Sequence, residues 1–212
     1  MSTEPNGGYP ATFDVAYPDR DLDRLTTLFR VFTLIPIAIV VGLVTSPYQV
    51  DAAHRVIPFV LGGGGLLFGA PLVMILFRQK YPRWWFDWNL ELTRFLSRVN
   101  VYAALMDDRY PSTDEQQSVK LEIVYPDVRN ELNRWLPLIK WFLALPHYFV
   151  LALLILTGVV CVLLAWFAIL FTGRYPRGLF DFLVGVGRWN LRVMAYAFLL
   201  TTDRYPPFSL AP

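Results

Sequence analysis

Two ionisable side chains lie inside an otherwise apolar run. Residues Leu136–Phe171 contain no Lys, Arg, His, Asp or Glu except Lys140 and His147. These two are seven residues apart, which places them on one stripe of a helix. An ionisable residue in such a segment is by default a candidate functional residue. His147 could relay protons and Lys140 could hold an anionic lipid headgroup. The alternative is that the Lys140 amine extends to the interface and His147 bonds a neighbouring helix.

A second set of candidate residues is basic and regularly spaced. Arg94 and Arg98 are four residues apart, and so are Arg188 and Arg192, so each pair lies on one stripe of a helix. Two basic stripes could bind anionic lipid headgroups or an acidic segment of a partner protein. The alternative is an ordinary basic surface, whose arginines pair with the acidic residues nearby: Asp87, Glu91 and Asp181.

Residues typical of enzymes and metal sites are scarce. The one cysteine, Cys161, lies in an apolar run and the two histidines lie in different segments, which argues against disulfide, zinc and haem sites. No serine lies in a G-x-S-x-G elbow. A formal net charge of +2 does not favour nucleic acid as a partner. We therefore expect no cofactor and no metal, and we favour a non-enzymatic protein.

The composition points to a membrane. The chain is 55% hydrophobic with a mean hydropathy of +0.41, whereas a soluble domain is usually about 45–50% apolar. Leu28–Thr45 and Val56–Phe77 are apolar stretches about as long as a bilayer-spanning helix, roughly 20 residues. A polar connector separates them, so they predict a transmembrane hairpin. No signal peptide precedes them, and we expect the N-terminus to stay cytoplasmic.

The third apolar run, residues 136–171, is long for one helix and short for two. We favour a second hairpin that turns near Thr157–Gly158. With two hairpins, every Lys and Arg except Arg55 falls on one side, which the positive-inside rule makes cytoplasmic. A single crossing would place Arg174, Arg177 and the later arginines outside. A single crossing remains the alternative.

The chain resembles two copies of one unit. Tyr81-Pro82-Arg83 recurs 94 residues later at Tyr175, and "DRYP" occurs at residues 108–111 and 203–206. Each unit begins with an alternating segment, residues 12–17 and 119–125, and we expect these two strands to pair as a ribbon. The predicted divisions are a disordered tail at 1–10, a first unit at 11–111, a linker at 112–118 and a second unit at 119–208.

Each unit ends with an amphipathic helix that starts at the Tyr-Pro-Arg phrase. Proline suits the first helical turn, and tyrosine, tryptophan and arginine suit the membrane interface. We favour helices that lie in the membrane plane over two further spans. The expected fold is mainly α-helical and membrane-embedded: two tandem units, each a short strand, a transmembrane helical hairpin and an in-plane amphipathic helix. The predicted interfacial anchors are Tyr81, Arg83, Trp84, Trp85, Tyr175, Arg177 and Trp189.

With these motifs, the chain resembles a family of uncharacterised bacterial integral membrane proteins, known only as a domain of unknown function. The resemblance rests on the paired "DRYP" phrases and on "YPRxxFD" at residues 81 and 175, and it covers roughly residues 10 to 208. It implies a membrane location and supplies no catalytic residues.

The expected function is that of a scaffold or accessory subunit in the bacterial cytoplasmic membrane. It would cross the membrane several times, with both termini cytoplasmic, and its cytoplasmic face would bind membrane lipids and another membrane or membrane-associated protein. Two alternatives are a small transporter or channel, and a lipid-modifying enzyme that uses interfacial carboxylates.

Overall fold

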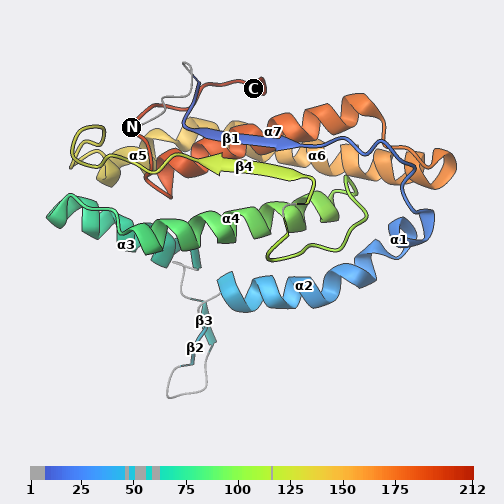
Figure 1. The fold of residues 1–212 in the computed structure, drawn as a ribbon, viewed down its shortest axis with the longest axis horizontal. Coiled ribbons are helices and arrows are strands. Elements are labelled where there is room, and N and C mark those ends of the chain that lie inside the picture. Colours follow the sequence, from blue (N-terminus) through green and yellow to red (C-terminus); the bar gives the residue numbers. More distant parts are fainter. Residues whose placement is uncertain (1–7, 46–47, 51–55, 59–62, 116) are drawn as a thin grey trace.

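The computed structural model describes residues 8–45, 48–50, 56–58, 63–115 and 117–212 (Figure 1). Most of the predicted tail at 1–10 lies outside these residues. The described part holds seven helices and four strands. Their bounds are β1 Ala11–Val15, α1 Arg24–Leu28, α2 Arg30–Thr45, β2 Tyr48–Val50, β3 Val56–Pro58, α3 Gly63–Arg78, α4 Arg83–Ala103, β4 Val119–Ile123, α5 Pro137–Leu143, α6 Leu145–Thr172 and α7 Arg177–Ala197.

The predicted ribbon is confirmed. Strands β1 and β4 pair antiparallel, with Phe13 opposite Leu121. Because side chains alternate between the two faces of a strand, Val119, Leu121 and Ile123 are buried together while the residues between them face solvent. The ribbon thus places the strand at the start of the first half of the chain beside the strand at the start of the second half.

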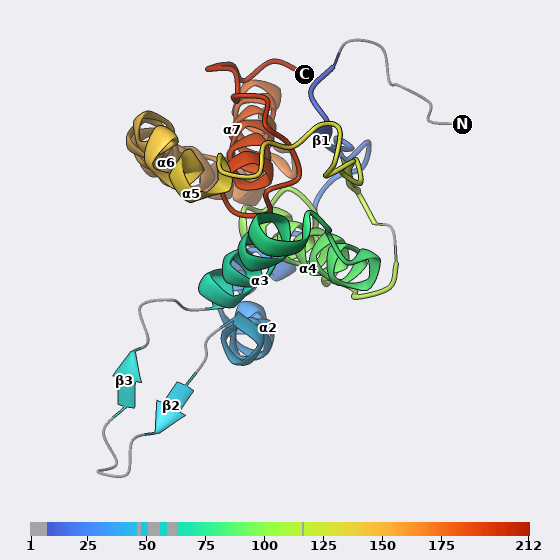
Figure 2. The same cartoon turned by 90° about the vertical axis from the view of Figure 1, so that its left-hand side faces the viewer.

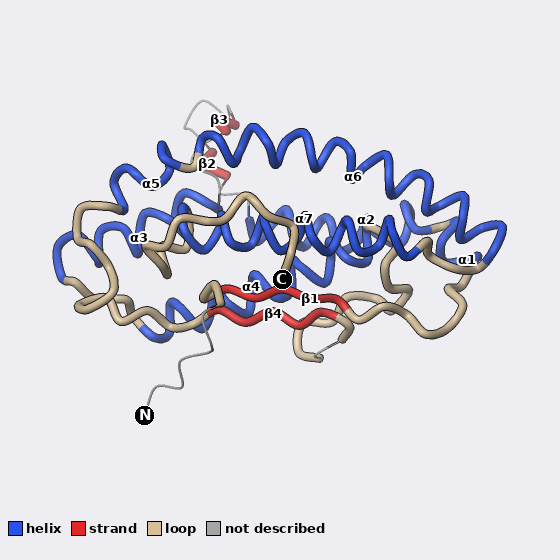
Figure 3. Tube along the Cα trace, turned by 90° about the horizontal axis from the view of Figure 1, so that it is seen from above, coloured by secondary structure: helices blue, strands red, loops and turns tan. Residues whose placement is uncertain are grey.

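The helices lie in layers along the same axis as the ribbon. Seen from above, α6 follows one edge, α7 lies next to it and the ribbon lies at the opposite edge (Figure 3). Viewed along the axis, α2 and α6 occupy the sides of the molecule that face away from β1 (Figure 2). The main core lies between the ribbon, α4, α7 and the inner faces of α3 and α6.

The predicted second hairpin is wrong, and so is the two-unit fold of membrane hairpins. Helix α6 runs without a break through the predicted turn. The Thr157 hydroxyl donates to the Leu153 carbonyl one turn earlier, and Gly158 lies against Leu183 of α7, so both residues fit inside a helix. Among the described residues, α6 is the one helix both long and apolar enough to cross a membrane.

The first apolar segment also differs from the prediction. Helices α2 and α3 have 16 residues each, fewer than the roughly 20 that a span needs. Val56–Pro58, predicted to start a span, forms a strand that pairs with β2. Two β-branched residues followed by proline favour a strand over a helix start. Parts of the connector, at 46–47, 51–55 and 59–62, lie outside the described residues.

The helices that follow the Tyr-Pro-Arg phrases begin where the sequence predicts. Helices α4 and α7 both start directly after proline and have 21 residues each. Shortly after each helix comes a buried leucine with left-handed backbone, Leu105 and Leu200. Helices α3 and α6 end alike, with left-handed Gln79 and Gly173. These matched features agree with an internal repeat, which itself stays a prediction.

Candidate functional site

The four arginines predicted to bind lipid or a partner contact the chain's own backbone. The Arg94 Nε donates to the Leu121 carbonyl at 3.1 Å, and the Arg188 Nε donates to the Phe13 carbonyl at 2.9 Å. Phe13 and Leu121 are opposite one another in the ribbon. Each amphipathic helix therefore holds the strand that comes from the other half of the chain.

The second arginine of each pair ties down a loop. Arg98 donates to the carbonyls of Ser112 and Thr113, and Arg192 donates to those of Ser209 and Ala211. Arg98 and Arg192 are both buried. A buried guanidinium must satisfy its donors inside the protein, which these carbonyls do in part. A role for these arginines in lipid binding stays a prediction, but each of them already donates hydrogen bonds to carbonyls of the chain itself.

Lys140 lies in a fully enclosed site. Its amine is 2.6 Å from the Asp203 carboxylate and donates to the Thr202 carbonyl at 2.7 Å, and it faces the Tyr196 ring at 5.2 Å. The pKa of Lys140 is lowered by burial, and the Asp203 carboxylate opposes that shift. In this conformation the amine is not available to a lipid headgroup.

Arg30 occupies the corresponding place in the first half of the chain, and we did not predict it. Its guanidinium donates to the Asp107 carbonyl at 3.1 Å and stacks on the Tyr102 ring at 3.8 Å. A signal was present in the sequence, because Arg30 is the one charged residue of its apolar segment, as Lys140 is the one lysine of its own. Asp107 and Thr202 precede the two aspartates of the "DRYP" phrases.

Those two aspartates hold the start of each half. Asp108 accepts hydrogen bonds from the Arg20 guanidinium and from the Asp23 backbone amide. Asp203 accepts one from the Asn133 backbone amide in addition to its ion pair with Lys140. In each half of the chain, the "DRYP" phrase near the end is therefore hydrogen-bonded to a segment near the beginning.

His147 lies in an aromatic cage. The Trp189 indole donates to its Nδ1 at 3.0 Å, and the Phe208 ring stacks on the imidazole at 4.0 Å between centroids. The imidazole is completely buried. Because an indole N–H can only donate, Nδ1 is the acceptor and the neutral ring carries its proton on Nε2. Trp189, predicted as an interfacial anchor, is buried in the same contact.

The two Tyr-Pro-Arg phrases form elbows between successive helices, and their tyrosines lie inside the protein. Tyr81 and Tyr175 are buried, and their hydroxyls donate to the carbonyls of Leu199 and Ala104. Burial raises the pKa of both phenols well above the usual value. The elbow carbonyls in turn accept hydrogen bonds from the tyrosines of the "YPD" phrases, Tyr125 to Tyr81 and Tyr17 to Tyr175.

Other predicted anchors lie nearer the surface. Trp84 is 69% exposed and contacts the half-buried Trp85 edge-on at 5.3 Å. The Arg83 guanidinium lies over the Tyr125 ring at 4.7 Å, and that of Arg177 lies over another tyrosine ring at 4.3 Å. These two arginines therefore cover the tyrosines that hold the elbows.

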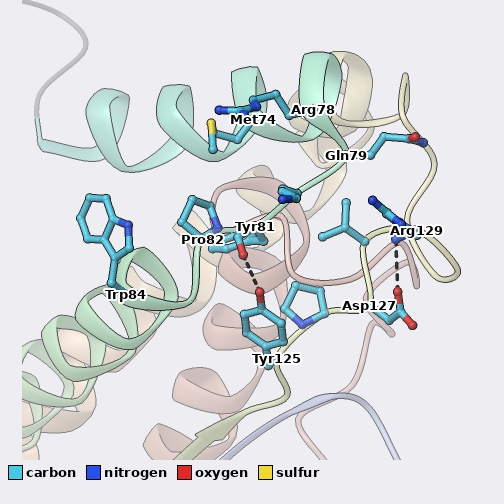
Figure 4. Close-up of a pocket in the computed structure, with 12 residues that line it drawn as sticks. Met74, Arg78, Gln79, Tyr81, Pro82, Trp84, Tyr125, Asp127 and Arg129 are labelled. Carbon is cyan, nitrogen blue, oxygen red and sulfur yellow. Dashed lines mark hydrogen bonds between the residues drawn. The ribbon is translucent and has the colours of Figure 1, made fainter.

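A pocket opens where α3 turns into α4. Figure 4 shows Met74 and Arg78 on α3 at one side, Trp84 at another and Arg129 on the loop after β4 facing them. The cavity has a volume of about 710 Å³, within the usual range for small-molecule sites. Its lining residues are Met74, Arg78, Gln79, Lys80, Tyr81, Pro82, Trp84, Tyr125, Pro126, Asp127, Val128 and Arg129.

The pocket is lined by three exposed cations and one carboxylate. Within the described residues, the side chains of Arg78, Lys80 and Arg129 make no direct hydrogen bond, ion pair or ring contact, although the charge of Arg129 contributes to lowering the pKa of Asp127. The one lining carboxylate, Asp127, accepts from the Asn130 side-chain amide at 2.7 Å and from two backbone amides. The Asn130 hydrogen bond is the main reason that the pKa of Asp127 is lowered. We did not predict this pocket, because three separate segments form it.

The chemistry available at the pocket is anion binding. Among the described residues, no group of three or more His, Cys, Asp and Glu side chains is placed to hold a metal. The arginines and the lysine can donate several charged hydrogen bonds to one anion. Met74 and Trp84 add apolar contact on one side.

Comparison with known proteins gives one match to a protein family, and it lies in the second half of the chain. Residues 135–209 match the model of a family described as a domain of unknown function, DUF4389. The match covers α5, α6, α7 and the segment that follows them. It supports the resemblance to an uncharacterised family. A search of curated proteins and a search of solved structures both gave no match.

Proposed function

We propose that this chain is a non-enzymatic scaffold or accessory subunit, anchored in the bacterial cytoplasmic membrane by an apolar face centred on α6. The observation that carries the proposal is α6 itself. Its most apolar stretch has a mean hydropathy of 2.8, yet only 22% of that stretch is buried in the protein. A core helix of a soluble protein would be mostly covered, so this helix calls for an apolar surrounding.

The apolar face extends beyond α6. We define it by the exposed large apolar side chains of four helices, α2, α3, α5 and α6. Of these helices, α2 and α6 lie on the sides of the molecule away from β1 (Figure 2). Monomeric soluble proteins rarely expose a contiguous apolar surface of this kind. Members of the face include Val31, Phe32, Ile35, Ile39, Leu43, Val73, Phe77, Trp141, Phe142, Phe149, Leu153, Leu156, Val160, Leu164, Phe167 and Phe171.

The proposed orientation has the long axis of the molecule in the membrane plane. Helix α6 and the ribbon run along the same axis, so an upright α6 would carry the ribbon and its charged side chains to the depth of the acyl chains (Figures 1 and 3). A crossing α6 would also separate Arg134 before α5 from Arg174 after α6, against the positive-inside rule. With the axis in plane, both lie on the cytoplasmic side.

The ribbon side would face the cytoplasm and a partner protein. Lys120 and Glu122 point away from the core on β4, and the segments that contain Tyr9 and Ser209 both lie beside α7. Hydrogen bonds from Arg94, Arg98, Arg188 and Arg192 to backbone carbonyls hold the ribbon and the neighbouring loops in place, so this side is a rigid surface. A rigid polar surface held close to a membrane suits a scaffold or accessory role better than a transport path.

Depth measurements at Cys161 test the anchor. Cys161 lies near the middle of α6, and on a Cys161→Ser background Phe149→Cys and Phe171→Cys place probes near its two ends. In vesicles, a polarity-sensitive dye on each thiol should be quenched by nitroxides at one common depth. Thr113→Cys, in a polar loop, should instead react with a water-soluble maleimide.

Equal water accessibility of Cys161 and the Thr113→Cys thiol would overturn the anchor. Shallow ends with a deep centre would overturn the in-plane orientation and favour a span.

Native mass spectrometry of the protein extracted in its own membrane patch tests the proposed partner. Additional protein masses would support an accessory subunit, and their consistent absence would overturn that part of the proposal.

A further inference from the structure

We propose that the pocket between α3, α4 and the loop after β4 binds a phosphate monoester, whose apolar group lies against Met74, Trp84 and the exposed side of α3. This rests on the proposed membrane function only for the source of the ester, which is either a lipid headgroup or a soluble metabolite. The chemistry recognised, an anionic phosphate carrying an organic group, is the same for both.

The two ends of the molecule differ in charge at positions that correspond in the repeated phrases. Counting along the repeated phrases, Lys80 corresponds to Arg174 and Arg129 corresponds to Asp21. At the far end, Arg174 and Asp21 form an ion pair at 3.0 Å and neutralise one another. In the pocket the equivalent positions are both cationic and both line the same cavity. Like charges that line one cavity repel one another, and a bound anion would relieve that repulsion.

Arg78 strengthens this asymmetry. It corresponds to Thr172 at the far end, so the pocket has a further cation where the other end has a hydroxyl. Arginine can bind phosphate through two parallel hydrogen bonds, and a lysine adds a mobile third donor. The Asp127 carboxylate offsets only one of the three positive charges: it accepts hydrogen bonds from Asn130 and the loop backbone, and the charge of Arg129 contributes to its lowered pKa.

The backbone at the pocket is strained in a way that the far end avoids. Gln79 has a φ of 47°, and the paired position is Gly173, which adopts left-handed backbone without a steric penalty. The Lys80 amide donates to the Met74 carbonyl and the Gln79 amide to the Ile75 carbonyl, which ends α3 sharply. The turn places Arg78 and Lys80 on either side of it. Retained strain of this kind is typical of functional sites.

The surroundings fit an ester better than a bare ion. The cavity of about 710 Å³ is far larger than one phosphate group. Val73 and Phe77 are exposed on α3, and the 69% exposed Trp84 borders the pocket, so an apolar group leaving it would meet the apolar face. Cations beside tryptophan at the border of an apolar surface are what a headgroup site requires.

The test uses the full chain in phosphate-free detergent micelles and isothermal titration calorimetry. The probes are glycerol 3-phosphate, dihexanoyl phosphatidic acid and dihexanoyl phosphatidylcholine. We expect the phosphatidic acid to bind at least tenfold more tightly than the phosphatidylcholine. Equal binding of glycerol 3-phosphate would assign a soluble ester as the source, and a strong preference for phosphatidic acid would assign a lipid.

Arg129→Asp is the decisive variant, because it recreates the neutral arrangement of the far end. It should weaken phosphatidic acid binding tenfold or more without lowering the unfolding temperature. Arg78→Gln should weaken binding about tenfold. The matched controls are Arg24→Gln and Lys120→Gln, two cations that are likewise unpartnered within the described residues but lie outside the pocket, and they should change affinity less than twofold.

Two results would overturn the inference. One is that neither phosphate monoester, glycerol 3-phosphate or phosphatidic acid, binds more tightly than phosphatidylcholine, and the other is an equal loss in pocket and control variants. Failure of the membrane proposal would look different. The dye on Cys161 would then be as accessible to water as the one on Thr113→Cys. Glycerol 3-phosphate would still bind to the wild type, and Arg129→Asp would still weaken that binding.

Discussion

The buried ion pair of Lys140 and Asp203 permits a quantitative test of the structure. Lys140→Met keeps most of the alkyl chain but removes the amine from Asp203 and from the Thr202 carbonyl. Removing one partner of a buried pair usually costs about 3–5 kcal/mol, because the other charge loses its partner. The Asp203 side chain is 19% exposed and water can solvate part of it, so we expect a loss of about 3 kcal/mol.

Reversible unfolding in micelles, followed by tryptophan fluorescence, measures this loss. For a chain of 212 residues, about 3 kcal/mol corresponds to a fall of roughly 6–12 °C in Tm. Asp203→Asn should also destabilise, and the double variant should cost at least about 1 kcal/mol less than the sum of the single ones. Lys120→Met, at an exposed cation on the ribbon, should stay within about 0.5 kcal/mol.

Two results would contradict a buried ion pair between Lys140 and Asp203. A loss below about 1 kcal/mol in Lys140→Met would mean that the amine is not buried in the ion pair. Strict additivity in the double variant would mean that Lys140 and Asp203 do not interact, whatever each contributes alone.

Three further changes have defined outcomes. Burial raises the pKa of Asp107, but hydrogen bonds from Arg109 and Ser118 lower it by more, so the net pKa lies below the usual 3.8. The stability that the ionised carboxylate contributes is therefore lost as the pH falls through this lowered pKa. The difference in unfolding free energy between the wild type and Asp107→Asn should therefore shrink between about pH 5 and about pH 2, and a constant difference would contradict it. Gln79→Gly relieves a left-handed backbone and should raise stability by up to about 1 kcal/mol in chemical denaturation, whereas a loss would show that the Gln79 side chain makes a needed contact. A Cβ at Gly187 would lie 2.6 Å from the Phe13 ring, so Gly187→Ala should cost about 1–3 kcal/mol in thermal unfolding. Gly178 has open space around it, so Gly178→Ala should be neutral or stabilising. Equal effects of the two changes would contradict the packing of α7 on β1.

Local patterns in the sequence were reliable where one segment decides its own structure. Alternation in residues 119–123 predicted a strand, and proline before Arg83 and Arg177 predicted two helix starts. The pairing of the two strands was also predictable, because an isolated strand needs a partner. Each of these depends on neighbouring residues or on one simple requirement.

The sequence was misleading where a residue has two compatible roles. Thr157 and Gly158 are turn formers, but here the hydroxyl bonds within α6 and the missing side chain admits Leu183 of a neighbouring helix. Hydropathy measures how apolar a run is and does not count its crossings. The number of predicted spans was therefore wrong although the apolar segments themselves were recognised.

The candidate site was least predictable, because it depends on side chains from distant segments. Spacing places Arg94 and Arg188 on helix stripes but cannot show that a strand from the other half of the chain covers them. The pocket cations lie on α3, the elbow and the loop after β4, and only folding brings them together. The charge difference between Arg129 and Asp21 is visible in the aligned repeats, but the sequence does not show that Arg129 lies beside Lys80.

The exchange of contacts between the halves also sets an order of assembly during translation. Arg94 and its ribbon partner Leu121 are 27 residues apart, so α4 can capture β4 soon after both leave the ribosome. Arg188 and Phe13 are 175 residues apart, and Tyr9 bonds the carbonyl of a residue 183 positions away. Strand β1 is made first, yet α7, which covers it, is made last. A nascent chain that stops after α6 would thus have α4 against β4 but no α7 against β1, and in the complete fold the segment that matches the family model packs on the chain's first strand.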